Sequence, residues 1–355
     1  MIKRFSTFSL DYDRLEKAVL SVYRAAEARG GIFEHGLERY LPQWGIPEEM
    51  EHSPQRMETK DPEEASRYLW TMASLERKSL TRVNISNGRR VWKDPNQRWV
   101  FHPEEVVNKG LDAVRRVFTE EFRYTLNGFP ENYMYNAMRL FRNYSNDPRK
   151  VVEGKTVAQA RESLIHFAGI GTGISNLYLL YLTDRHITSP TDPENLLLKV
   201  DVHKSRIPIN TEAVTSKEDF IRRDLIVSVL ERAYWKICKK HDLDAGLLDS
   251  ALWITGSEVC AKRDYEACLS SCSLASELCT ACIPEDENLG KFIVRINGQR
   301  NDVRKNSNHA YMDFFSKVPH ARRNGLKKDE DSGDNSKDES GLNPASDHPE
   351  LFKSE

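Results

Sequence analysis

Long apolar segments are missing from this sequence. No run approaches the roughly 18 apolar residues that a membrane-spanning helix needs. Lys3 and Arg4 are followed by a polar, acidic segment, whereas a secretory signal would continue with an apolar stretch. Internal repeats are absent too. We therefore expect a soluble, cytoplasmic protein without a membrane partner.

Cysteine is scarce outside one short segment. Of the six cysteines, five lie between Cys260 and Cys282. Clustered cysteines without a secretory signal favour metal binding over disulfide bonds. The sixth, Cys238, lies on an apolar helical stripe, and we expect a buried thiol there.

Charge is nearly balanced over the 355 residues but unevenly distributed. The formal net charge of the whole chain is −2, and that of residues 327–355 is −5, so residues 1–326 carry a net charge of +3. With 39% hydrophobic and 30% charged residues, the composition is that of a globular protein with a polar surface. A basic body of this kind permits nucleic-acid binding without requiring it.

Apolar residues recur at helical spacing through most of the chain, which predicts an all-α fold. The clearest helices are residues 11–29, residues 61–76 with Asp61 as cap, and a segment that Thr156 and Gln159 open as a capping box. Further helices are expected at residues 104–118, at residues 132–144 with Met134, Ala137, Met138 and Phe141 inward, and from about residue 216 to residue 240.

These patterns divide the chain into five segments. They are an N-terminal helical extension (residues 1–60), a helical domain (61–259), a cysteine loop (260–285), a C-terminal extension (286–323) with a short strand at 291–296, and a disordered acidic tail (324–355).

A glycine hairpin lies between two helical segments, at residues 167–173. Gly169, Gly171 and Gly173 alternate with Ile170 and Thr172. Glycines in such a turn leave backbone N–H groups uncovered at the start of the second helix, and these groups suit a phosphate.

An aspartate in an apolar setting follows one helix and one loop later. Asp201 lies between Val200 and Val202, and the basic residues Lys204 and Arg206 come directly after it. A partly desolvated carboxylate of this kind is typical of a functional site. A helix N-cap is the alternative role of Asp201, and the two roles are compatible.

The order of hairpin, aspartate and cysteines resembles the helix-hairpin-helix (HhH-GPD, endonuclease III-like) superfamily of DNA glycosylases. Cys260, Cys268, Cys272 and Cys279 follow the run Leu252-Trp253-Ile254-Thr255-Gly256, as the iron–sulfur loop follows that domain in the family, although the family's loop is one residue shorter in each gap. The resemblance covers roughly residues 60 to 285. It implies a two-lobed helical fold that acts as a monomer on duplex DNA containing an abnormal base.

The resemblance also implies cofactors. The four cysteines would hold a [4Fe–4S] cluster, with Cys282 as an alternative fourth ligand and zinc as an alternative occupant. The hairpin residues Gly169, Ile170, Gly171, Thr172 and Gly173 would bind the DNA backbone, with a shared monovalent cation. Lys204 and Arg206 are further candidates for DNA contacts.

Asp201 inherits the catalytic position of the family. Breaking an N-glycosidic bond builds positive charge on the sugar, which a carboxylate stabilises directly or meets by taking a proton from attacking water. Family members that also cut the strand carry a lysine where this chain has Gly173, so AP lyase activity is not expected. Lys199 and Lys204, on either side of Asp201, are the alternative source of such an amine.

The loop after residues 61–76 supplies the base wedge in the family, which makes Glu76 and Arg77 candidates; an exposed charged helix end is the alternative. The sequence thus predicts a monofunctional DNA N-glycosylase of base excision repair. A DNA-structure-binding protein without catalysis and a nucleosidase on modified nucleosides or RNA are the competing hypotheses.

Overall fold

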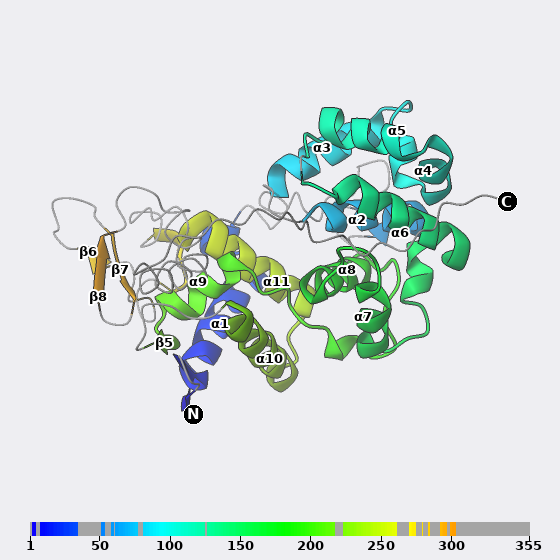
Figure 1. Ribbon diagram of the computed structural model, residues 1–355. Helices are drawn as coiled ribbons and strands as arrows, with labels where there is room; N and C mark the ends of the chain where they lie inside the picture. Colours follow the sequence, from blue (N-terminus) through cyan, green and yellow to red (C-terminus); the bar gives the residue numbers. More distant parts are fainter. Residues whose placement is uncertain are drawn as a thin grey trace, which may run out of the picture. The chain divides into compact units, whose positions relative to one another are not determined.

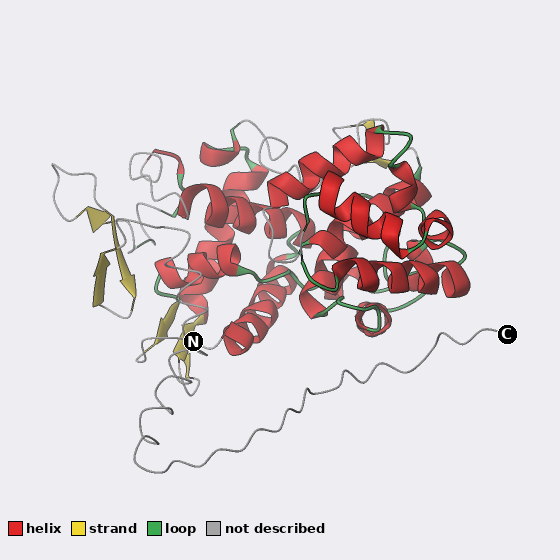
Figure 2. Ribbon diagram, turned by 45° about the horizontal axis from the view of Figure 1, so that its top comes forward, coloured by secondary structure: helices red, strands yellow, loops and turns green. Residues whose placement is uncertain are grey.

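The computed structural model describes residues 2–4, 8–34, 51–53, 58–59, 61–76, 81–124, 126–216, 223–260, 270–274, 279, 283–284, 292–296 and 299–302. Helices make up most of this part of the chain, and the strands are short (Figures 1 and 2). The described fold is therefore mostly helical, as the periodicity predicts. None of the described helices combines the length and the apolar character that a membrane crossing requires.

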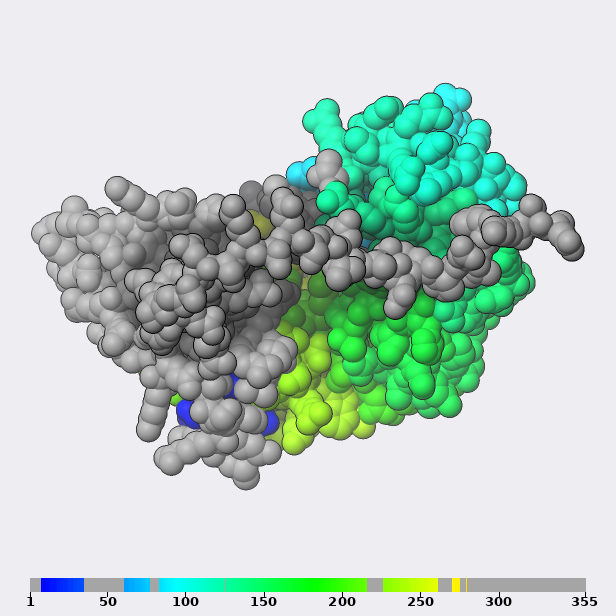
Figure 3. All heavy atoms as spheres, in the orientation of Figure 1, coloured from blue at the N-terminus to red at the C-terminus, as the bar shows by residue number. Residues whose placement is uncertain are grey.

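One group of helices is formed by consecutive segments from residue 62 to residue 184. In the space-filling view these helices form a continuous body, coloured from cyan to green (Figure 3). α2 contacts α8, α4 contacts α6, and α7 contacts α8. The members are α2 (Pro62–Leu75), α3 (Thr81–Lys93), η4 (Arg98–Phe101), α4 (Pro103–Lys109), α5 (Leu111–Arg116), η5 (Val117–Glu121), α6 (Phe129–Tyr144), η6 (Pro148–Val151), α7 (Val157–Ile165) and α8 (Thr172–Asp184).

The second group combines one helix near the start of the chain with helices from residues 202 to 260. α1 (Tyr12–Glu27) contacts α9 (Val202–Asn210), α10 (Arg223–His241) and α11 (Ala245–Ile254), and α9 also contacts η8 (Thr255–Cys260). Arg14 of α1 donates from Nε to the carbonyl oxygen of Thr211, which ties α1 to the end of α9. α8 of the first group contacts α11 of the second. Short single turns lie at η1 (Gly31–Phe33) and η7 (Pro193–Asn195).

Three small antiparallel sheets accompany the helices. The first joins β1 (Ile2–Arg4), β2 (Phe8–Asp11) and β5 (Val214–Ser216), so the N-terminal segment pairs with the chain just after α9. The second pairs β3 (Glu51–Ser53) with β4 (Glu58–Thr59). The third has the order β6 (Ile283–Pro284), β7 (Phe292–Ile296) and β8 (Gln299–Asp302), and β7 matches the strand predicted at residues 291–296.

Local signals in the sequence place several helix starts correctly. Asp61 caps α2 by accepting from the backbone N–H groups of Glu63 and Glu64, with Pro62 in the first turn. Thr156 and Gln159 form the reciprocal capping box at α7. Cys238 is 7% exposed and belongs to the core, as its stripe predicts.

Two predicted helices differ from the structure. The helix expected at residues 104–118 is interrupted at Gly110, whose φ of +79° separates α4 from α5. On α6, Ala137 is buried and Met134 is partly buried against the core, as predicted, whereas Phe141 is 38% exposed. Tyr133, Asn136 and Leu140 are buried as well, so the inward stripe is shifted from the predicted one.

The helix expected from residue 216 also starts later. Val214–Ser216 is a strand, because it pairs with β2, and α10 is described from Arg223. Most of the predicted C-terminal extension and all of the predicted tail lie outside the described residues.

Candidate functional site

The glycine hairpin joins α7 to α8 and leaves its backbone amides accessible. Gly169 adopts a φ of +75°, which glycine adopts without strain. Ile170 is 5% exposed and anchors the turn in the core, while Gly169, Gly171 and Thr172 are exposed. Among the described residues, no side chain caps the N-terminus of α8.

Four amides of the hairpin have no partners within the described part of the chain. There, no oxygen accepts a hydrogen bond from the main-chain N–H groups of Gly169, Gly171, Thr172 or Gly173, whereas the N–H of Ile170 donates to the carbonyl oxygen of Phe167. Backbone N–H groups that converge at a helix start favour an anion through both hydrogen bonding and the helix dipole. The predicted phosphate contact is therefore sterically open.

Asp201 caps α9 with one of its two carboxylate oxygens. Oδ1 accepts from the backbone N–H groups of His203 and Lys204, each at 3.0 Å. No described residue forms a hydrogen bond with Oδ2, and no described basic side chain forms an ion pair with Asp201. The carboxylate is half-buried. One oxygen is thus fixed in place, while the other has no hydrogen-bond partner among the described residues.

The first lysine after Asp201 points inward and pairs with a different carboxylate. Lys204 is 1% exposed, and its Nζ lies 2.8 Å from Oδ1 of Asp249 on α11. The same ammonium donates to the carbonyl oxygen of Lys199 at 2.9 Å, and Asp249 accepts from the backbone N–H of Lys199 at 3.2 Å. The buried pair therefore holds the peptide that leads into Asp201.

Lys199 connects this loop to the hairpin helix and to α2. Its Nζ lies 3.3 Å from Oε2 of Glu76, and both side chains are largely buried. Its Cγ would lie 3.9 Å from a Cβ placed on Gly173, an ordinary van der Waals distance. The Asp201 loop thus lies against the first turn of α8, at Gly173.

The surrounding charges keep Asp201 ionised. Burial by itself would raise the pKa of Asp201, but Lys204, His203 and Lys199 outweigh it, and the pKa lies below the usual 3.8. For Asp249, burial raises the pKa although Lys204 opposes the shift. Since Lys204 and Lys199 already have Asp249 and Glu76 as partners, the charge on Asp201 is not neutralised by direct contact.

Arg206 fixes the imidazole of His203. Its Nη1 lies 2.7 Å from Nδ1 of His203, and a guanidinium only donates, so Nδ1 accepts and the ring proton belongs to Nε2. Burial lowers the pKa of His203, with Arg206 and Lys204 adding to the effect against Asp201, which favours the neutral ring.

The same guanidinium connects α9 to η8. Nη1 of Arg206 donates to the carbonyl oxygen of Gly256 at 3.0 Å. A Cβ at position 256 would overlap the carbonyl oxygen of His203, so only glycine permits this approach. The segment that enters the cysteine loop is thereby held against the first turn of α9.

Three predictions for basic or acidic side chains need correction. Lys204 and Arg206 are each 1% exposed, which contradicts direct DNA contacts from either; both are oriented inward by Asp249, His203 and Gly256. The side chain of Glu76 is 12% exposed and held by Lys199, which contradicts its role as a projecting wedge. Arg77, the other wedge candidate, lies outside the described residues.

Asp249 and His203 are parts of the site that the sequence reasoning missed. The available signal was an aspartate within the otherwise apolar run Leu247–Ile254, where a charge requires a buried partner. For His203 it was the spacing of three between His203 and Arg206, which places both on one helix face.

The cysteine segment is described only in part. Cys260 is 7% exposed, and Cys272 and Cys279 are partly buried against the core. Cys268 and Cys282 lie outside the described residues, and the residues that are described contain no group of three His, Cys, Asp or Glu arranged to hold a metal. The cluster and its fourth ligand stay predictions, as does the cation at the hairpin.

Comparison with known proteins adds no assignment: no protein-family model matches the chain, and no curated protein matches its sequence.

Proposed function

We propose that this protein is a monofunctional DNA N-glycosylase with an endonuclease III-like fold. It would hydrolyse the N-glycosidic bond of a damaged, mismatched or modified base that has been extruded from duplex DNA. One observation carries the proposal. The ionised carboxylate of Asp201, whose Oδ2 has no partner among the described residues, lies in a loop that packs against the hairpin helix α8. The hairpin would hold the strand while the carboxylate faces the sugar.

The two groups of helices support the fold part of this proposal. α8 belongs to the first group and α9 to the second, and the loop between them carries Lys199 and Asp201. A site between two sets of helices is a common place for a ligand. An extruded base would enter there, at an energetic cost that is lowest for a poorly paired base.

Asp201 would act mainly through its charge. Cleavage of the glycosidic bond leaves an oxocarbenium-like sugar, and a preorganised carboxylate stabilises that charge without moving. A carboxylate with a lowered pKa is a weak base, so charge stabilisation suits it better than proton abstraction from water. The base departs with the electron pair of the glycosidic bond, and water adds to the sugar to leave an abasic site. The proton that this water loses passes through solvent to the departed base.

Strand cleavage by an amine is not part of the proposal. Gly173 has no amine, and Lys199, which lies beside it, is an ammonium paired with Glu76. A protonated amine has no lone pair with which to form a Schiff base. Lys204 is enclosed by Asp249 and the Lys199 carbonyl.

The cluster would be held by Cys260, Cys268, Cys272 and Cys279, or by Cys282 in place of the last. Thiolates at these short separations suit a [4Fe–4S] group, whose contribution would be to order the loop near DNA. Gly256 and Arg206 already fix the segment from which that loop departs.

A lesion screen tests the proposed function. Full-length protein is incubated with duplexes that each carry one abnormal base, and hot alkali then converts abasic sites into strand breaks. We expect breaks with at least one duplex for the wild type and none for Asp201→Asn. No product across a broad panel would refute the glycosylase.

Borohydride trapping tests the monofunctional assignment separately. We expect no covalent protein–DNA adduct with the wild type. Gly173→Lys is the matched positive variant, because a Cβ at 173 meets only ordinary contacts and its amine would lie beside the Asp201 loop. An adduct with the wild type that disappears in Lys199→Met would assign lyase chemistry to Lys199.

One observation favours a second candidate, a protein that binds DNA structure without catalysis. Both hydrogen bonds of a regular N-cap are present at Asp201, so capping alone would account for this residue. The two candidates diverge in Asp201→Asn, which keeps the cap and removes the charge. Retained biological effect in that variant would support the binding protein.

A further inference from the structure

Two side chains of α6, Asn136 and Arg139, form hydrogen bonds with the backbone just before Gly169 of the hairpin. Asn136 is 2% exposed; its Nδ2 donates to the carbonyl oxygen of Ala168 at 3.0 Å, and its Oδ1 accepts from the Ala168 N–H at 2.7 Å. One amide group thus satisfies both polar groups of the residue that precedes Gly169. Because these bonds hold the peptide groups on both sides of Ala168, Asn136 sets the direction in which the hairpin starts.

Arg139 reaches the same segment one turn later on α6. Its Nη1 donates to the carbonyl oxygen of His166 at 2.7 Å, and its guanidinium carbon lies 4.8 Å from the centre of the Phe167 ring. No described residue accepts a hydrogen bond from Nη2. Because Arg139 is half-buried and stacked on an aromatic ring, its guanidinium is held in one place beside the hairpin.

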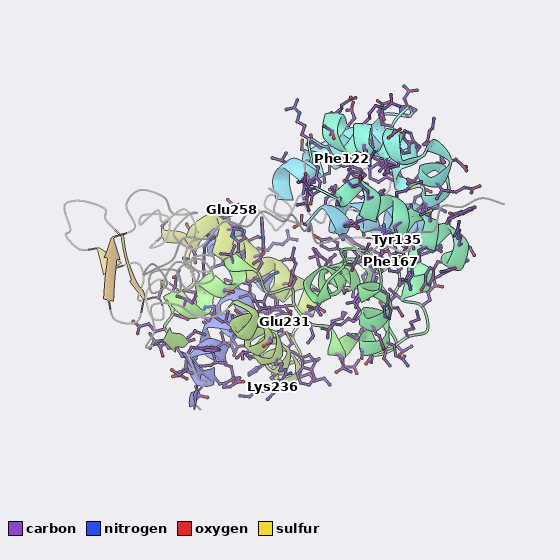
Figure 4. All side chains as sticks on the ribbon, viewed as in Figure 1. Phe122, Tyr135, Phe167, Glu231, Lys236 and Glu258 are labelled. Atoms are coloured by element: carbon purple, nitrogen blue, oxygen red, sulfur yellow. The ribbon has the colours of Figure 1, made fainter. Side chains whose placement is uncertain are left out.

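Tyr135 completes this surface. It lies four residues before Arg139, which places the two side chains next to each other on α6. The ring is 49% exposed, one of the few large side chains with apolar area that the described chain leaves in solvent. Figure 4 labels Tyr135 on α6 and Phe167 at the hairpin.

We propose that Tyr135 and Arg139 form a second backbone contact for DNA, beside the phosphate site at the hairpin amides. The inference builds on the proposed function, since it assumes DNA at the hairpin. A guanidinium whose Nη2 has no described acceptor can donate to a phosphate oxygen, and a phenol combines a hydroxyl donor with a ring face that packs on deoxyribose. The occupant is the sugar–phosphate backbone of the strand that the hairpin holds, and no base is read there.

Asn136 has a different task in this arrangement. It touches no DNA and acts as a positioning residue, because its bonds to Ala168 fix the hairpin amides relative to α6. Arg139 thus contributes a charge that contacts phosphate. Asn136 orients the uncharged backbone N–H donors of the hairpin.

Salt dependence of binding separates these tasks. Full-length protein is titrated against a fluorescein-labelled, undamaged duplex over a series of salt concentrations. Each lost phosphate contact makes the slope of log affinity against log salt shallower by about 1. We expect that change for Arg139→Met and a normal slope for Arg139→Lys. Asn136→Ala should weaken binding several-fold with the slope of the wild type. Tyr135→Phe and Tyr135→Ala should weaken it progressively.

Arg24→Met is the matched control. Arg24 is an exposed arginine on α1, so its replacement changes the net charge equally without touching α6 or the hairpin. Thermal unfolding of each variant verifies folding, and Arg139→Lys keeps the comparison valid if Arg139→Met is unstable. A wild-type slope in Arg139→Met together with wild-type affinity in Tyr135→Ala would refute the α6 contact alone. A wild type that does not bind duplex DNA even at low salt would refute the proposed function as well.

Discussion

The N-termini of α8 and α9 are the two ends on which the proposed function depends, and they are built in opposite ways. α8 begins at Gly171 without a side-chain cap from any residue that the structure describes, and Gly171 and Thr172 are exposed. α9 begins at Asp201, whose carboxylate accepts from the backbone N–H groups of residues 203 and 204. The first end offers donors to a ligand, while the second satisfies its donors internally and offers a carboxylate oxygen.

This difference shows how one structural element serves two purposes. Every helix start has unsatisfied N–H groups, and a protein either caps them or leaves them to a ligand. At α8 glycine leaves them available for an anion, and at α9 the cap itself becomes the reactive group. Lys199 and Lys204, on either side of Asp201, lie inward and pair with Glu76 and Asp249 respectively. The following variants test the contrast between the two ends.

Asp201→Asn should have the largest effect. Asparagine caps a helix about as well as aspartate, so the fold should persist while base release falls by about 10²- to 10³-fold. Single-turnover measurement of base release, with circular dichroism to verify the fold, provides the comparison. Equal rates for the two proteins would show that the start of α9 has only a structural role.

Lys204→Met should destabilise the protein by about 3–5 kcal/mol, because it leaves Asp249 buried without its cation. Urea unfolding gives the value. Lys204→Met with Asp249→Asn should recover much of the loss, since the asparagine oxygen still accepts from Lys199. The control is Lys240→Met, which removes an exposed partner of Glu16 and should cost only about 0–1 kcal/mol. Equal losses in both single variants would contradict the buried pair.

Gly171→Ala should weaken DNA binding without harming the fold. Its φ of −94° suits alanine, and a Cβ there meets no atom within 4 Å. The methyl group would hold a phosphate away from the amides, at about 1.5–3 kcal/mol for a hydrogen bond to a charged group, or roughly 10- to 100-fold in affinity. Anisotropy titration and thermal unfolding measure the two properties. Unchanged affinity would mean that no phosphate approaches this end of α8.

The pH dependence of stability should show the smallest effect. The folded-state pKa of Asp201 is lowered, so its ionised form stabilises the native state above the unfolded value and loses this contribution as pH falls through the folded pKa. The advantage of the wild type over Asp201→Asn in unfolding free energy should therefore be greatest near neutral pH and shrink below pH of about 4. Urea unfolding from pH 7 to pH 3 measures it, and an advantage that grows in acid would indicate a raised pKa.

Much of the candidate site could be anticipated where its signals are local. These local features are the hairpin, the caps at Asp61 and Thr156, and the position of Asp201 at a helix start. Each of them depends on residues within one turn of each other. The orientation of Lys204 and Arg206 could not be anticipated this way, since a basic residue next to a functional aspartate is usually expected in solvent. Each side chain turns inward because a buried acceptor lies nearby: the carboxylate of Asp249 for Lys204, and the carbonyl oxygen of Gly256 for Arg206. These acceptors belong to α11 and η8, which come later in the chain.

The sequence by itself determined the helices, the glycine turn and the aspartate that begins α9, because hydrogen bonding within one turn and the freedom of glycine at positive φ need no distant partner. Only the tertiary structure decided which charges face one another. Glu76 reaches Lys199 across 123 residues, and Asn136 of α6 reaches the hairpin across 32. Buried polar groups need partners to offset their desolvation, and the fold selects those partners from segments that no local pattern connects.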